Sequence, residues 1–124
     1  MAKFFLLAVA GACGTLARYG LGGLVQRLAG GAFPLGTMAV NVLGCFLFGA
    51  VWSMAAERDL LTDQARLLIL TGFMGAFTTF STFLFETGQM MRDSQWLLAA
   101  GNVAAQTVVG IACVFLGFAA GRWI

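Results

Sequence analysis

Long stretches without a single charged residue are the feature that most constrains this chain. Four such runs cover residues 4–17, 28–56, 67–85 and 94–121. A helix needs about 20 largely apolar residues to cross a bilayer. Only 10% of the 124 residues are charged, against about 25% in soluble domains. The sequence therefore predicts an all-α integral membrane protein, a single domain over 1–124 with spans at about 3–29, 35–56, 64–91 and 95–122.

The third span contains a stretch poorly suited to a plain membrane helix, GFMGAFTTFSTF at 72–83. Its glycines loosen the backbone and its threonines can bond back to the chain. Its phenylalanines, at 73, 77, 80 and 83, follow the spacing of one helical face. An unpaired backbone group in hydrocarbon costs several kcal/mol, so a break needs cover from protein or a polar path. We expect a break in this helix that lines a conduction or binding path; the alternative is a glycine-rich packing helix with lipid-facing phenylalanines.

Three polar residues inside or beside the spans are candidates for contacts with a ligand. Arg18 lies near the middle of the first helix, where it either attracts an anion or snorkels to a headgroup. Asn41 offers two donors and one acceptor, for a ligand or for a neighbouring helix. Glu86 lies at the mouth of any path, or is an ordinary interfacial carboxylate. The hydroxyls beside the expected break are those of Thr78, Thr79, Ser81 and Thr82.

This inventory favours an anion over a cation, because a cation path would more naturally show buried carboxylates. Phenylalanine has a positive ring edge, and edges turned inward would contact a small anion. In addition, carbonyls freed by the break around Gly75 and Thr78 could hold a cation in a structural role.

The fourth helix carries polar and small residues at helical spacing. Asn102 and Gln106 are four residues apart and share a face, and Gly117 and Gly121 form a G-x-x-x-G pattern for close packing. We expect this helix to pack inside a bundle or against a second copy.

The cysteines do not predict a disulfide framework or a metal site. Cys13, Cys45 and Cys113 all fall within predicted spans, and the sequence has no C-x-x-C pair and no histidine. Small buried thiols are the simplest interpretation. The apolar run from Lys3 to Cys13 is also compatible with a secretory or lipoprotein signal.

The charged residues specify the membrane orientation only weakly. With four spans, one side collects four basic residues and the other collects two, and acids in or near the middle loop dilute the difference. The chain could insert in both orientations and two copies could pair antiparallel. The basic residues on the two sides are Lys3, Arg58, Arg66 and Arg122, and Arg27 and Arg92.

Three motifs in chain order resemble the Fluc fluoride channels, also called CrcB proteins. They are GTLARY at 14–19, GTMAVNVLG at 36–44, and the stretch at 72–83. The resemblance covers essentially the whole chain. It implies a dual-topology antiparallel homodimer in the bacterial inner membrane, with lipid, fluoride and a second copy as partners and no nucleic acid. It further implies two pores through which fluoride leaves the cytoplasm passively, which lowers fluoride toxicity.

The resemblance also implies roles for individual residues. Phe80 and Phe83 would turn ring edges to fluoride, Asn41 would supply the pore amide, and Ser81 and Thr82 would supply hydroxyls. Gly75 and Thr78 would give backbone carbonyls to a structural Na⁺ at the dimer centre, and Arg18 and Glu86 would lie in the vestibule. The residues on the fourth helix that line the path stay open.

Three other functions compete with a channel. A small dual-topology multidrug transporter would need a carboxylate in the first helix, where this chain has Arg18. An assembly or chaperone subunit would use glycine and phenylalanine for packing only. A membrane enzyme is disfavoured, because the sequence shows no histidine, metal cluster or nucleophile–base pair.

Overall fold

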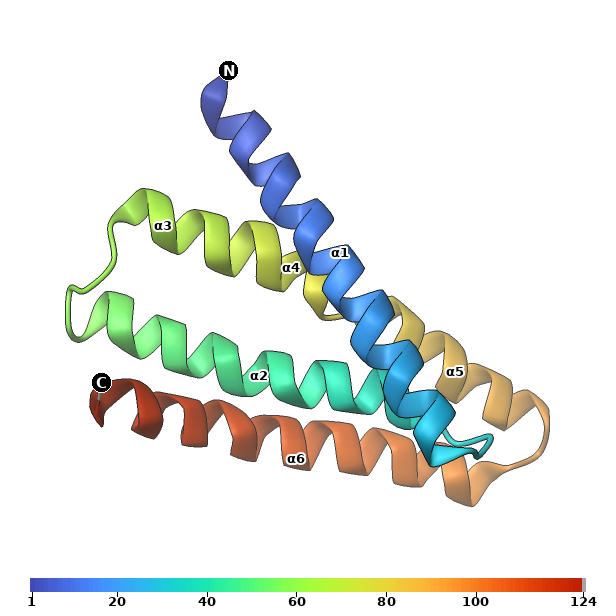
Figure 1. Cartoon of the computed structure of the whole chain (residues 1–124). Helices are drawn as coiled ribbons and strands as arrows, with labels where there is room; N and C mark the ends of the chain where they lie inside the picture. The colour runs from blue at the N-terminus through green and yellow to red at the C-terminus, as the bar shows by residue number, and fades with distance from the viewer. Residues whose placement is uncertain (124) are drawn as a thin grey trace.

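The computed structural model describes residues 1–123, and these form an all-helical bundle (Figure 1). Four helical stretches are long and apolar enough to cross a membrane: Ala2–Ala29, Leu35–Ala56, Asp63–Arg92 and Trp96–Trp123. The first, second and fourth are the helices α1, α2 and α6. The prediction of four apolar helices is confirmed, and the chain is a multi-pass membrane protein.

The third stretch is assembled from several segments. In chain order these are α3 (Asp63–Leu67), the π-helical segment η1 (Leu68–Met74), α4 (Gly75–Phe77) and α5 (Phe80–Arg92). Between α4 and α5, Thr78 and Thr79 have extended backbone, with φ/ψ of −83°/158° and −147°/112°. The Thr78 amide still donates to the Met74 carbonyl at 3.0 Å, and the helical hydrogen-bond series stops at the Thr79 amide, which donates to Asn41 instead. The two threonines lie three and four residues after Gly75, and Gly75 itself keeps helical dihedrals.

Close backbone contact joins α2 to α6, which run side by side in Figure 1. A methyl group added at Gly117 would lie 2.1 Å from the Phe46 carbonyl oxygen, and one at Gly49 would lie 2.3 Å from the Val114 carbonyl oxygen. Gly121 makes a similar approach to Ala50. The glycine pattern of the fourth helix therefore packs against the second helix of the same chain.

Helix α1 crosses the rest of the bundle obliquely, so that its N-terminal half projects away from α2 and α6 (Figure 1). Its contact with the third stretch depends on Gly14, where an added methyl group would lie 2.2 Å from the Phe73 carbonyl oxygen. Gly30 ends α1 in the left-handed region (φ 66°), which glycine adopts without strain. Thr62 caps α3, since its hydroxyl accepts a hydrogen bond from the Ala65 amide at 3.2 Å.

The phenylalanines of the third stretch do not form the single helical face that their spacing predicts. Phe73 and Phe77 stack with ring centroids 5.7 Å apart, and Phe77 is buried in a small core with Val40. Phe80 and Phe83 form a second, tilted pair with centroids 5.9 Å apart. The extended residues between them interrupt the helical periodicity on which the prediction depended.

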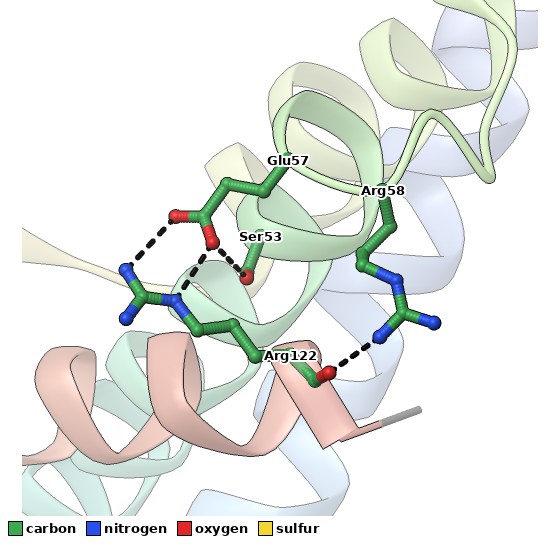
Figure 2. Close-up of polar contacts among 4 residues, drawn as sticks. All are labelled: Ser53, Glu57, Arg58 and Arg122. Atoms are coloured by element: carbon green, nitrogen blue, oxygen red, sulfur yellow. Dashed lines mark hydrogen bonds and ion pairs between the residues drawn. The ribbon is translucent and has the colours of Figure 1, made fainter.

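A polar cluster joins the ends of α2 and α6 (Figure 2). The Arg122 guanidinium donates to both oxygens of the Glu57 carboxylate, at 2.7 and 3.2 Å, and the Ser53 hydroxyl donates to the same carboxylate. Arg58 donates to the Arg122 main-chain carbonyl. The hydrogen bond from Arg122 holds the pKa of Glu57 below its usual value.

Candidate functional site

The extended backbone between α4 and α5 is held by the side chain of Asn41 on α2. The Thr79 amide donates to Asn41 Oδ1 at 2.8 Å, and Asn41 Nδ2 donates to the Thr79 carbonyl at 3.1 Å. The carboxamide thus pairs with both polar groups of one residue, as a neighbouring strand would. It satisfies two backbone groups that hydrocarbon could not.

A chain of hydrogen bonds continues from Asn41 across the bundle. Asn41 Nδ2 also donates to Gln106 Oε1 at 2.8 Å. Gln106 Nε2 donates to Asn102 Oδ1 at 3.0 Å, and Asn102 Nδ2 donates to the Thr87 hydroxyl at 2.9 Å. Thr87 in turn donates to the Phe83 carbonyl at 2.8 Å. The side chains of α2 and α6 are therefore connected to the helix that carries Phe80 and Phe83.

The smaller of two neighbouring cavities lies beside this chain of hydrogen bonds and has a volume of about 340 Å³. It brings together Asn41, Phe80 and Phe83, and adds Gln106 and Thr107 from α6. Phe83 is buried, with 8% of its surface exposed, whereas Phe80 is 71% exposed. The cavity is therefore a mainly apolar space whose lining also includes amide and hydroxyl groups. Its remaining lining residues are Gly44, Cys45, Phe48, Thr78, Thr79 and Val114.

The larger cavity, of about 690 Å³, contains the charged candidates. Arg18, Thr82 and Glu86 all line it, and Thr37 donates to Glu86 Oε1 at 2.7 Å. The other carboxylate oxygen of Glu86 is buried and has no hydrogen-bond partner among the described residues. Thr79, one of the two extended residues, lines both cavities.

Ser81 lies apart from both groups. Its side chain is exposed, lines neither cavity, and its hydroxyl is 3.4 Å from that of Thr79. The Thr79 hydroxyl instead pairs with Thr82, donating to the Thr82 hydroxyl at 2.9 Å and accepting from its amide at 3.3 Å. Of Ser81 and Thr82, whose hydroxyls were predicted to line the path, only Thr82 lines one of the two cavities.

The carbonyl groups of Gly75 and Thr78 lose the amide partners that a continuous helix would give them. The Thr79 amide donates to Asn41 and not to Gly75, and the Thr82 amide donates to the Thr79 hydroxyl and not to Thr78. Gly75 is exposed on the surface of the single chain. These two carbonyls are therefore available to a partner outside the helix.

The sequence did not identify Thr87 or Gln26 as site residues, and it did not predict the contact between Gln106 and Asn41. Gln26 accepts from the Gly36 amide at 3.0 Å, donates to the Gly31 and Phe33 carbonyls, and also lines the larger cavity. The shared face of Asn102 and Gln106 was the only signal for this network, and their hydrogen bond confirms it.

Titratable side chains are concentrated in the larger cavity, and none with a carboxylate or an amine lines the smaller one. Over residues 1–123, no group of three or more His, Cys, Asp or Glu side chains lies close enough to hold a metal ion. The arrangement can attract an ion into the larger cavity and offer it neutral donors and aromatic rings in the smaller one.

Comparison with known proteins gives consistent matches over the whole chain. A family model described as "CrcB-like protein, Camphor Resistance (CrcB)" matches residues 5–118. A protein of Nitrosococcus oceani is 60% identical over 94% of this chain and 93% of its own length. Proteins of Solidesulfovibrio magneticus and Nitratidesulfovibrio vulgaris (strain Miyazaki F) are 56% and 54% identical, over 98% and 100% of both chains. All three are named fluoride-specific ion channel FluC.

Proposed function

The chain belongs to the CrcB family, and from this premise we propose that it is a fluoride-selective channel for the passive export of fluoride from the cytoplasm. The names of its relatives support fluoride as the transported ion. Membership of the family makes this chain a transport protein rather than an enzyme. The observation that carries the proposal is the meeting of Asn41, Phe80 and Phe83 at one cavity beside the extended backbone.

The physical logic begins with hydration. Fluoride holds its water strongly, so a selective path must replace that water with fixed donors and positive edges. Ring edges of Phe80 and Phe83 carry partial positive charge, and the lining of the same cavity also includes amide and hydroxyl groups. Chloride is larger, and under this proposal the passage beside the aromatic rings rejects it on size.

The larger cavity fits the role of a vestibule. Arg18 supplies the positive charge that draws an anion in, and Thr82, which accepts a hydrogen bond from the extended residue Thr79, lines the same cavity. An anion passing from there to the smaller cavity meets Thr79, which lines both. The membrane potential drives the exit of an anion by about 2.3 kcal/mol per charge for each 100 mV, so no coupled energy source is needed.

We further propose that two copies pair antiparallel in the bacterial inner membrane. Unsatisfied carbonyls cannot face hydrocarbon, and the Gly75 carbonyl belongs to an exposed residue of the single chain. Phe80, although it lines a cavity, is 71% exposed in this chain. A second copy would cover both, and the weak charge bias permits both orientations.

A structural Na⁺ at the centre of that dimer fits the same carbonyls. Na⁺ is a hard cation that prefers oxygen ligands, and the Gly75 and Thr78 carbonyls lack the amide partners of a helix. Their partner-subunit equivalents would complete a shell of oxygens without a carboxylate. We expect the purified dimer to be more resistant to dissociation in Na⁺ than in N-methylglucamine, as measured by size-exclusion chromatography.

The test of the proposed function is ion efflux from proteoliposomes that hold the purified protein. Fluoride and chloride electrodes run in parallel, and valinomycin with K⁺ clamps the potential. We expect rapid fluoride release without chloride release. Absence of fluoride release from folded protein in Na⁺ buffer would overturn the proposal and favour a non-conducting assembly subunit.

A further inference from the structure

We infer that Thr87 and Asn102 are positioning residues that fix which atoms of the side-chain amides face the cavity containing Phe80 and Phe83. This inference rests on the proposed passage of an anion through that cavity. Asn102 is fully buried and Thr87 is 4% exposed, so neither contacts the ion. They act through Gln106, which is 9% exposed and lines the cavity.

The donors of Asn41 are already committed. A carboxamide has two N–H donors, and those of Asn41 go to the Thr79 carbonyl and to Gln106 Oε1. Its oxygen accepts from the Thr79 amide. An anion in the cavity therefore finds no free N–H on Asn41 unless one of these bonds opens.

Gln106 has the free donor that Asn41 lacks. Its oxygen accepts from Asn41, and its nitrogen uses one N–H for Asn102. The second N–H has no hydrogen-bond partner among the described residues, and the side chain borders the cavity. In the reverse orientation the carbonyl oxygen of Gln106 would take the place of this nitrogen and would repel an anion.

The direction of the amides is set at both ends by backbone groups. At one end, the Thr79 amide needs the oxygen of Asn41 and the Thr79 carbonyl needs its nitrogen. At the other end, the Phe83 carbonyl can only accept, so the Thr87 hydroxyl donates to it and is left to accept from Asn102. Asn102 must then present its oxygen to Gln106. Every hydrogen bond in the series points the same way, which strengthens each of them.

Replacement of Thr87 tests the inference. Thr87→Val keeps the volume and removes the hydroxyl, which leaves an N–H of buried Asn102 unpaired. We expect about tenfold lower fluoride flux per folded channel. The loss of one buried hydrogen bond lowers, by roughly that factor, the preference of the amides for the orientation that presents an N–H to the cavity. We also expect the fluoride-to-chloride permeability ratio to fall. Thr87→Ser restores the hydroxyl and is expected to restore both quantities.

The matched control is Thr71→Val, which removes a hydroxyl from an exposed position of the same membrane-spanning stretch. It is expected to leave flux and selectivity unchanged. Wild-type flux and selectivity in Thr87→Val would overturn the inference. A serine variant as defective as the valine variant would overturn it too, because packing and not the hydroxyl would then be responsible.

A measurement on the unaltered protein decides the question if Thr87→Val fails to fold. Hydrogen exchange of ¹⁵N-labelled side-chain amides, in bicelles, should show two slow protons on Asn41 and one slow and one fast proton on Gln106. Two slow protons on Gln106, or a fast proton on Asn41, would refute the assigned direction. Failure of the wild type to pass fluoride would refute the proposed function. The exchange pattern would still test the direction of the side-chain amides, because it does not depend on fluoride flux.

Discussion

The contact between α2 and α6 predicts a large penalty for adding one methyl group at Gly117. The new Cβ would lie 2.1 Å from the Phe46 carbonyl oxygen and 2.9 Å from the Ala50 amide nitrogen, whereas ordinary contact begins near 3.4 Å. Both neighbours are backbone atoms of α2, so no side chain can move aside. The two helices must separate by about an ångström. Overpacking of this kind lowers the free energy of unfolding by about 1–3 kcal/mol. Because the backbone of α2 is rigid, we expect Gly117→Ala to lie near the upper end of that range.

Gly101→Ala on the same helix provides the matched control. Nothing lies within 4 Å of a Cβ at Gly101, so this substitution gains up to about 1 kcal/mol of helix propensity. The two variants should therefore differ by about 3–4 kcal/mol in their free energy of unfolding. Reversible unfolding with increasing SDS in mixed micelles measures that difference. Equal stability of the two variants would refute the view that backbone contact at Gly117 holds α2 to α6.

The remaining predictions concern the site and the end of the bundle. Phe80→Ile and Phe83→Ile should each reduce fluoride efflux from proteoliposomes while the protein stays folded, because a branched side chain has no positive ring edge; normal efflux in both would rule out the ring-edge mechanism. Asn41→Asp should destabilise the fold by about 1–3 kcal/mol in SDS unfolding, because it removes two donated hydrogen bonds in the membrane; a variant as stable as the wild type would contradict the role of Asn41 in holding the extended backbone. The pKa of Glu57 is lowered by its hydrogen bond from Arg122, so this ion pair stabilises the fold above the ordinary carboxyl pKa, and the stabilisation is lost as the pH falls through the lowered value. Arg122→Gln should accordingly reduce the acid dependence of unfolding, and an unchanged pH profile would show that the exposed pair contributes nothing.

The four helices could be predicted because a bilayer imposes a simple rule on composition. Charge is too costly in hydrocarbon, so charge-free runs report directly where spans lie. Contacts within one helix could also be predicted from residue spacing. The hydrogen bond between Asn102 and Gln106 follows from their separation of four residues. The glycines of the fourth helix indicated close packing, but the sequence left open whether the contact was within the chain or with another copy.

Contacts between helices could not be read in the same way. No local pattern states that Asn41 pairs with Thr79, which lies 38 residues away, or that Gln106 is its second partner. The phenylalanine spacing was misleading, since helical periodicity applies only while the helix continues. Two extended residues were enough to divide the predicted face into two pairs of rings.

The interruption of the third stretch explains why the polar residues of this chain lie where they do. Extended backbone at Thr78 and Thr79 releases amides and carbonyls that hydrocarbon cannot satisfy. Asn41 satisfies both polar groups of Thr79, and its remaining N–H then needs an acceptor, which Gln106 supplies. Each carboxamide that accepts a hydrogen bond also has N–H donors that need an acceptor. The series therefore ends only at the backbone of α5, where the Phe83 carbonyl accepts from Thr87. A break in one helix therefore requires polar side chains on two others, and two of these side chains, Asn41 and Gln106, line the smaller cavity.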